Sequence, residues 1–171
     1  MIALRKFQIF KVGAEMLKIK SYLNISKVHG IGLFAGENIK EGTILWQYNP
    51  FIDQMFSMRK FQTVTQSLNY YGLQHLYASS YKRNNKYYYI TDNARFINHS
   101  EKGYNIVFTD DHTEIASKDI KKDDEILENY FLCYDRDDWF YFEINNLEVS
   151  KYLKLNGKER KNYAESRHLP G

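Results

Sequence analysis

Cysteine and proline are scarce in this chain, and long runs of hydrophobic residues are missing. The 171 residues include one cysteine, Cys133, and two prolines. One cysteine cannot form a disulfide within the chain, and no cysteine–histidine spacing is typical of a zinc site. Arg5, Lys6 and Lys11 interrupt the apolar residues near the start, so we expect no signal peptide, no membrane-spanning segment and a reducing compartment.

Hydrophobic residues make up 43% of the chain and aromatic residues 16%, which is enough to bury the core of one domain. Tyrosine is the most frequent aromatic residue, with 15 copies against 11 of phenylalanine. Because tyrosine has an apolar body and a polar tip, this surplus suits half-wet pockets and grooves. A general compositional drift toward Asn, Lys, Ile and Tyr would give the same surplus, and both explanations stay open.

Charge is unevenly distributed along the chain, although the net charge is only +3. Residues 110–138 contain eleven acidic and four basic residues, whereas residues 151–171 contain six basic and two acidic ones. The acidic stretch either steers a cationic partner toward the protein or forms solvated turns. The sequence leaves both interpretations open.

Alternation of apolar and polar residues predicts short strands along most of the chain. Charged or glycine-containing turns separate them, and no internal repeat or low-complexity linker occurs. Many short strands around one inserted helix predict a mainly β domain built from several small sheets. The expected strands cover residues 16–26, 30–35, 43–48, 86–90, 105–109, 113–117 and 124–130.

One segment has a helical period. Apolar residues recur three or four positions apart between 58 and 71, which predicts a helix that Ser57 caps and that Gly72 kinks or ends. Residues 79–85 are expected to form a loop. The aromatic and polar residues from 134 onward predict a separate, partly helical flap.

Several short motifs suggest chemistry when taken alone, but none is specific. His99 and Ser100 are adjacent, so on an extended chain they point to opposite faces and do not form a base–nucleophile pair. Cys133 is more typical of a small hydrophobic residue, and Gly30 and its neighbours are too short for a dinucleotide fingerprint. Residues 82–90 mix cations with aromatics, which keeps a nucleic-acid-binding β domain as a weaker alternative.

Four longer motifs become specific only when their order along the chain is considered. They are HGIGLFA at 29–35, IKEGTILWQYN at 39–49, DNARFINHS at 92–100 and IASKDIKKDDEILENY at 115–130. Together they resemble the SET-domain protein lysine methyltransferases over about residues 17–131. The resemblance implies a mainly β SET fold of several small sheets, with a pseudoknot, an inserted helix and a partly helical C-terminal flap.

The resemblance implies a binding site for S-adenosylmethionine. Gly30, Ile31 and Gly32 match the glycine pair at which the family brings bare backbone against the methionine part of the cofactor. The cysteine-rich zinc flanks of histone-specific members are absent here. We therefore expect the aromatic flap around Trp139 to cover the adenine by packing alone.

The remaining implied site residues lie in the central and last motifs. Asn98 and His99 match the family's cofactor-binding pair, and Arg95 before them would brace the cofactor carboxylate or the knot. Tyr130 falls at the family's closing catalytic tyrosine. Tyr48 matches the strand-end tyrosine that lines the channel of the target lysine.

The chain also departs from the family pattern. After Ser100 the usual proline is missing and one residue is added, so Asn105 stands near the place of the motif's last asparagine. Glu128 occupies a position where the family often has Phe or Tyr that limits the degree of methylation. Short, cysteine-poor chains of this kind resemble the bacterial or viral branch, which predicts a cytoplasmic, nuclear or host-interior location.

These expectations divide the chain into an N-terminal extension (1–16), a SET domain (17–131, with an inserted helical segment at about 56–80) and a flap with a basic tail (132–171). The implied function is S-adenosylmethionine-dependent methylation of a lysine in a partner protein, such as a histone or another basic protein. We expect no metal, membrane or nucleic-acid partner. The alternative is an inactive SET module that serves as a protein-binding domain.

Overall fold

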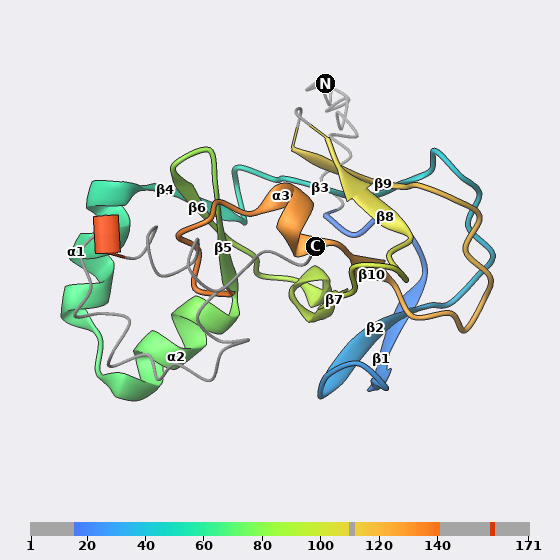
Figure 1. The fold of residues 1–171 in the computed structure, drawn as a ribbon, viewed down its shortest axis with the longest axis horizontal. Helices are drawn as coiled ribbons and strands as arrows, with labels where there is room; N and C mark the ends of the chain where they lie inside the picture. Colours follow the sequence, from blue (N-terminus) through green and yellow to red (C-terminus); the bar gives the residue numbers. More distant parts are fainter. Residues whose placement is uncertain (1–15, 110–111, 141–157, 160–171) are drawn as a thin grey trace, which may run out of the picture.

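The computed structural model describes residues 16–109, 112–140 and 158–159 of the chain. The fold is mainly β, with α1 and α2 together at one end and the β1–β2 hairpin toward the other (Figure 1). The helical elements are α1 (Met58–Ser67), α2 (Tyr70–Ala78), the 3-10 helix η1 (Asn93–Phe96) and α3 (Tyr130–Cys133). The strands are β1 (Ser21–Ile25), β2 (Ile31–Ala35), β3 (Ile44–Gln47), β4 (Gln54–Ser57), β5 (Ser80–Arg83), β6 (Lys86–Tyr89), β7 (Asn98–His99), β8 (Ile106–Phe108), β9 (Thr113–Ala116) and β10 (Leu127–Glu128).

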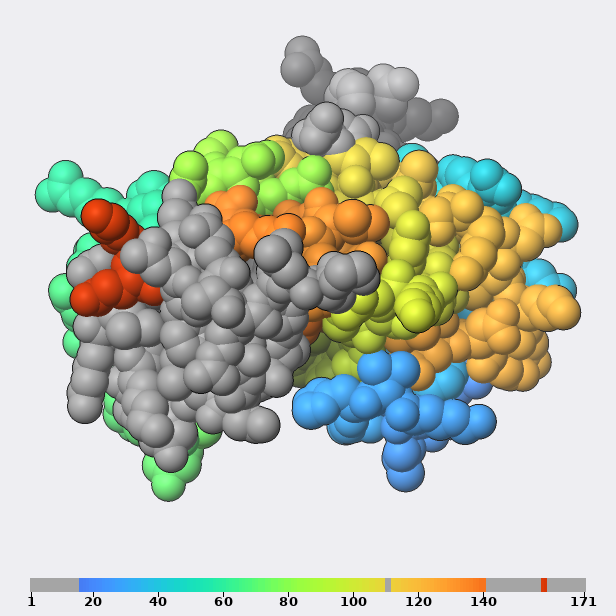
Figure 2. All heavy atoms as spheres, in the orientation of Figure 1, coloured from blue at the N-terminus to red at the C-terminus, as the bar shows by residue number. Residues whose placement is uncertain are grey.

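The described strands form three small sheets, as the sequence predicted. Strands β1 and β2 form a hairpin, β4, β6 and β5 form a second sheet, and the third has the order β3-β9-β8-β10-β7. Strand β10 runs parallel to β7 and β8, while the other pairs are antiparallel. On the face shown in Figure 2, the blue β1–β2 hairpin stands out from the rest of the coloured surface.

The pairing of β7 with β10 joins two motifs that are far apart in the sequence. Asn98 lies opposite Leu127 and His99 lies opposite Glu128. Asn105 extends this connection, because its side chain donates to the carbonyl of Glu125 at 2.8 Å and accepts from the backbone N–H of Leu127 at 2.9 Å. The parallel pairing is the contact that the predicted pseudoknot requires, since it holds the last motif against the central one.

Two hydrophobic clusters stabilise these sheets. The larger cluster lies between β2, β3 and the last strands, where Leu33, Leu45, Ile106 and Ile126 are fully buried. The second cluster forms where α1 and α2 pack on β4 and β6, and its members include Phe61, whose ring stacks on Tyr87 at a centroid distance of 3.6 Å. Burial of this apolar area is the main favourable contribution to folding.

The helical segment contains two helices where the sequence predicted one. Ser57 caps α1 by accepting the N–H of Lys60 at 3.3 Å, which confirms the predicted start. The chain leaves the helix at Leu68, and Asn69 then caps α2 by accepting the N–H of Gly72 at 2.9 Å. The prediction that Gly72 ends the helix was wrong, because this glycine lies in the first turn of α2.

The loop predicted at residues 79–85 was also wrong. Ser80–Arg83 is strand β5, and it pairs with β6 along its whole length. Asn84 and Asn85 form the tight turn between them with φ values of 51° and 57°. Asparagine tolerates this left-handed backbone, which a two-residue hairpin turn requires.

Some expectations fall outside the described residues. These include the N-terminal extension up to residue 15 and, apart from residues 158–159, the flap and tail beyond residue 140. Among the residues that are described, no helix has the length and apolar character needed to cross a membrane.

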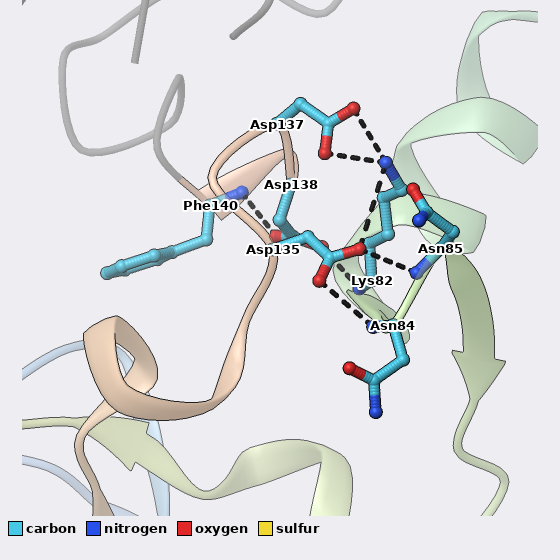
Figure 3. Close-up of polar contacts among 7 residues, drawn as sticks. All are labelled: Lys82, Asn84, Asn85, Asp135, Asp137, Asp138 and Phe140. Carbon is cyan, nitrogen blue, oxygen red and sulfur yellow. Dashed lines mark hydrogen bonds and ion pairs between the residues drawn. The ribbon is translucent and has the colours of Figure 1, made fainter. Parts of the chain in front are cut away.

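A buried lysine fixes the described part of the flap on the β5–β6 hairpin. Lys82 is 1% exposed, and its ammonium group lies 2.5 and 2.6 Å from the carboxylate oxygens of Asp137 and 3.8 Å from Asp135 (Figure 3). The backbone N–H of Lys82 donates to the carboxylate of Asp138, and the carboxylate of Asp135 accepts from the N–H groups of the Asn84–Asn85 turn. The segment that follows α3 is thereby tied to β5 by charge and by backbone hydrogen bonds.

We predict that Lys82→Met lowers the free energy of unfolding by about 3–5 kcal/mol, because it leaves the buried carboxylate of Asp137 without its cation. Lys86→Met is the matched control, since Lys86 is an exposed lysine of the same hairpin and should change stability by less than about 0.5 kcal/mol. Denaturant titration of both variants measures the difference. Equal losses would contradict a special role of Lys82.

Candidate functional site

A cavity of about 790 Å³ opens where the chain before β2, the η1–β7 segment, β5, α3 and the flap meet. This volume lies within the range of about 300–1,000 Å³ that is usual for small-molecule sites. The cavity brings together all the residues predicted for the site except Gly32 and Tyr48. The predicted residues in its wall are Gly30, Ile31, Arg95, Asn98, His99, Tyr130 and Trp139.

Asn98 connects the glycine motif to the last motif. Its amide nitrogen lies 3.0 Å from the carbonyl oxygen of His29, 3.2 Å from that of Ile31 and 3.0 Å from the Glu125 carboxylate. Gly32 lies just outside the cavity, where a Cβ atom would clash with the Glu125 carboxylate and lie 3.2 Å from the Asn98 amide. The packing of Glu125 therefore explains the glycine at this position.

Gly30 has a different reason to be a glycine. Its φ of +51° lies in the left-handed region, which glycine adopts without steric cost, and a Cβ atom there would meet no neighbour. The backbone turn at Gly30 brings the carbonyls of His29 and Ile31 toward Asn98. The motif thus shapes one edge of the cavity through its backbone.

His99 is held in one orientation by Tyr130. The backbone N–H of Tyr130 donates to Nδ1 of His99 at 3.1 Å, so the imidazole carries its proton on Nε2 when neutral. Burial lowers the pKa of His99, which favours the neutral form. The rings of Phe131 and Phe140 pack against the imidazole at centroid distances of 4.8 and 5.0 Å.

Tyr130 stands at the cavity end of a column of stacked tyrosines. Its ring stacks on Tyr134 at 4.4 Å, Tyr134 stacks on Tyr81 at 4.9 Å, and Tyr81 stacks on Tyr88 at 5.1 Å. The hydroxyl of Tyr130 donates to the carbonyl of Ile97. Burial raises the pKa of Tyr81, Tyr130 and Tyr134 well above 10, so the hydroxyls in this column stay protonated at neutral pH.

Tyr48 lies behind this column and outside the cavity wall. Its ring contacts Tyr88 and His112 edge-on, each at a centroid distance of 6.1 Å. Within the described residues, the tyrosines that share the cavity with Tyr130 are Tyr81 and Tyr134. Sequence reasoning did not identify either one, because Tyr81 was placed in a loop and Tyr134 at the start of the flap. The high tyrosine content was the one available signal.

Two buried glutamates, Glu114 and Glu128, also line the cavity. Burial raises the pKa of Glu128 to about 7, while a hydrogen bond from the Cys133 thiol and the charge of Arg83 lower it to a smaller extent. Burial and the charge of Glu128 raise the pKa of Glu114 as well. The sequence had indicated Glu128 only as a departure from the family pattern, and Glu114 was missed.

The family model of the SET domain matches residues 30–131 of this chain. The chain belongs to the SET-domain family. The match covers all four motifs except His29, and it ends one residue beyond Tyr130, whose ring is the first of the stacked tyrosines. SET domains are a family of methyltransferases. Asn98, His99 and Tyr130 of this chain line one cavity.

Solved structures are similar to this chain at low sequence identity. A chain of polycomb repressive complex 2 from Chaetomium thermophilum, solved with H3K27me3 and H3K27M, is 22% identical over 69% of this chain and 15% of its own length, with a TM-score of 0.51. A candidate histone methyltransferase of Plasmodium falciparum is 24% identical over 67% of this chain and 95% of its own, with a TM-score of 0.43. Comparison with curated proteins gave no match.

We predict that Glu128 makes stability depend on pH. Its pKa in the folded protein, about 7, is above the ordinary value of 4.5, so folding is favoured most below pH 4.5 and loses this contribution as pH rises through 7. Glu128→Gln should therefore gain about 3 kcal/mol relative to the parent between pH 4.5 and pH 8. Unfolding free energies of both proteins across this range measure the gain. A constant difference would contradict the assignment.

Proposed function

We propose that this SET domain is an S-adenosylmethionine-dependent protein lysine N-methyltransferase. The observation that carries the proposal is the cavity itself, where the Asn98–His99 strand and Tyr130 form one wall with a column of neutral tyrosines beside it. A catalytic site for amine methylation needs a place for the methyl donor and a dry, oriented place for the amine. This cavity can provide both.

The residues around the cavity fit the cofactor. When bound, S-adenosylmethionine supplies an electrophilic methyl group on a sulfonium. The Arg95 guanidinium suits its carboxylate, and the carbonyl groups beside Gly30 suit its ammonium group. The rings of Trp139 and Phe140 offer apolar faces to an adenine.

The tyrosine column suits the target amine. A free lysine has a pKa of about 10.4, so the neutral amine costs about 4 kcal/mol near neutral pH. Burial among aromatic rings disfavours the ammonium form and lowers that pKa. The Ile97 carbonyl, which accepts from the Tyr130 hydroxyl, is placed to hold a polarised methyl group through weak C–H···O contacts.

The charge pattern gives less support to a basic partner than the sequence suggested. Five of the nine acidic residues that the structure describes in the 110–138 stretch are used inside the fold: Asp135, Asp137 and Asp138 contact β5, and Glu114 and Glu128 are buried. Electrostatic steering by this stretch is therefore weaker than its sequence charge implies. The proposal of a lysine-containing protein substrate depends on the cavity rather than on surface charge.

We predict that Asn98→Ala weakens cofactor binding by about 1–3 kcal/mol, because it removes hydrogen bonds that position the cavity edge at His29 and Ile31. Asn24→Ala, on the exposed strand β1, is the matched control and should bind the cofactor as the parent does. Calorimetric titration with S-adenosylmethionine measures both affinities. Unchanged affinity in Asn98→Ala would contradict the assignment of this edge to the cofactor.

We predict that Tyr130→Phe lowers the single-turnover methylation rate about 100-fold while cofactor affinity nearly survives, because only the oriented hydroxyl is lost. Tyr71→Phe on α2 is the control, since Tyr71 is 77% exposed. Labelled cofactor and a mixture of basic proteins serve as substrates. If the parent protein binds the cofactor and methylates none of them, the alternative of an inactive protein-binding module is favoured instead.

A further inference from the structure

Among the residues that the structure describes, the two buried glutamates of the cavity have carboxylate oxygens without hydrogen-bond partners. Glu114 on β9 is 6% exposed and Glu128 on β10 is 5% exposed, and both line the cavity. Oε2 of Glu114 and Oε1 of Glu128 are buried and receive no hydrogen bond from the residues that the structure describes. Leaving a buried carboxylate oxygen without a donor is costly, so a ligand that supplies donors would be stabilised here.

The two glutamates line the same cavity as Tyr81, Tyr130 and Tyr134 of the tyrosine column. The charge of Glu128 contributes to the raised pKa of Tyr81, Tyr130 and Tyr134, and the charge of Glu114 contributes at Tyr81 and Tyr130. The same part of the cavity therefore combines two acidic groups with three aromatic rings. Aromatic faces and carboxylates both attract a cation, and an ammonium group can donate three hydrogen bonds.

Other charged and titratable groups act on the pair without neutralising it. The Cys133 thiol lowers the pKa of Glu128, and so does the Arg83 guanidinium, which lies 4.0 Å from the ring centroid of Phe108. Asp92 acts in the opposite direction, because its charge helps to raise the pKa of Glu114. Burial outweighs the two favourable contacts of Glu128, whose pKa remains near 7.

We propose that Glu114 and Glu128 form the receptor for the ammonium group of the substrate lysine, and that Glu128 accepts one proton from it. This inference rests on the proposed lysine methyltransferase function and assigns the proton acceptor of that reaction. In the proton step the lysine N–H bond breaks, its electron pair stays on nitrogen as the lone pair, and the proton forms the O–H bond of the Glu128 carboxyl.

The position of Glu128 suits this exchange. A proton acceptor works best when its pKa is near the working pH, and burial brings Glu128 to about 7. An arriving ammonium group first favours the carboxylate form, and loss of the lysine proton then leaves a neutral pair in the buried cavity. The bound pair is either a carboxylate with an ammonium group or a carboxylic acid with a neutral amine. When Glu128 is protonated before binding, formation of either pair from a free ammonium ion releases one proton to solvent.

The test is a calorimetric titration of the full chain with n-butylamine, a cationic analogue of the lysine side chain, in two buffers of different ionisation enthalpy. We expect proton release on binding, larger at pH 6 than at pH 8, because Glu128 is more often protonated at the lower pH. Glu128→Gln should bind the amine at least about tenfold more weakly and lose most of the proton release. Glu114→Gln should also bind more weakly.

Two controls separate charge recognition from packing. The neutral analogue n-butanol should bind the parent and Glu128→Gln equally, and Glu41→Gln, on the exposed Lys40–Gly42 turn, should bind n-butylamine as the parent does. The parent titration needs no variant, so the absence of proton release at pH 6 would by itself overturn the proposal. Equal amine affinity in the parent and both cavity variants would overturn it as well.

Failure of this inference can be told apart from failure of the proposed function. If Glu128→Gln binds n-butylamine with parental affinity and still methylates a basic protein at the parental rate, the receptor is wrong and the methyltransferase stands. If the parent binds n-butylamine in a Glu128-dependent way but methylates no protein with labelled cofactor, the receptor stands and the proposed function is wrong.

Discussion

The wall of the cavity depends on the ion pairing of the buried Lys82 ammonium group. Asp137 and Asp135 provide its counter-charges, and Asp138 binds its backbone N–H. This network, drawn in Figure 3, holds the segment after α3 against β5. The same segment contributes Trp139 and Phe140 to the cavity wall. A lysine and three aspartates thus fix this segment on β5. Removing one partner of a buried ion pair is costly, because the other charge is left uncompensated. The cavity wall is therefore expected to form together with the fold.

The cavity keeps its reactive groups neutral. Burial raises the pKa of the stacked tyrosines and of Glu128, and it lowers the pKa of His99. All these shifts favour the uncharged form, as expected for groups taken out of water. In such an environment a bound cation has a large effect, because its charge is poorly screened and changes the protonation of its neighbours. In the reaction that we propose, amine recognition and amine deprotonation are both consequences of the same burial.

Much of the fold could be predicted from local patterns. Short alternating segments predicted the strands other than β4, β5 and β7, Ser57 predicted the start of α1, and the order of four motifs predicted the SET family. Errors arose where a local signal conflicted with distant contacts. Residues 79–85 contain serine, lysine and two asparagines, which suggests a loop, yet β5 is stable because its lysine is neutralised by residues more than fifty positions later. The second helix depended on the cap at Asn69 rather than on apolar spacing.

The sequence by itself determined which segments meet, since Asn98, His99 and Tyr130 follow from motifs whose residue types and order are specific. Only the tertiary structure decided which other side chains share the cavity with them. Glu114, Tyr81 and Tyr134 come from separate segments, and Tyr48 lies behind them, so their distances depend on sheet pairing and packing. The same holds for the charged residues. The sequence shows the acidic stretch 110–138, but burial and ion pairing decide which of its carboxylates contact solvent, Lys82 or the cavity. Burial depends on contacts between residues that are distant in the chain, and local sequence patterns do not predict these contacts.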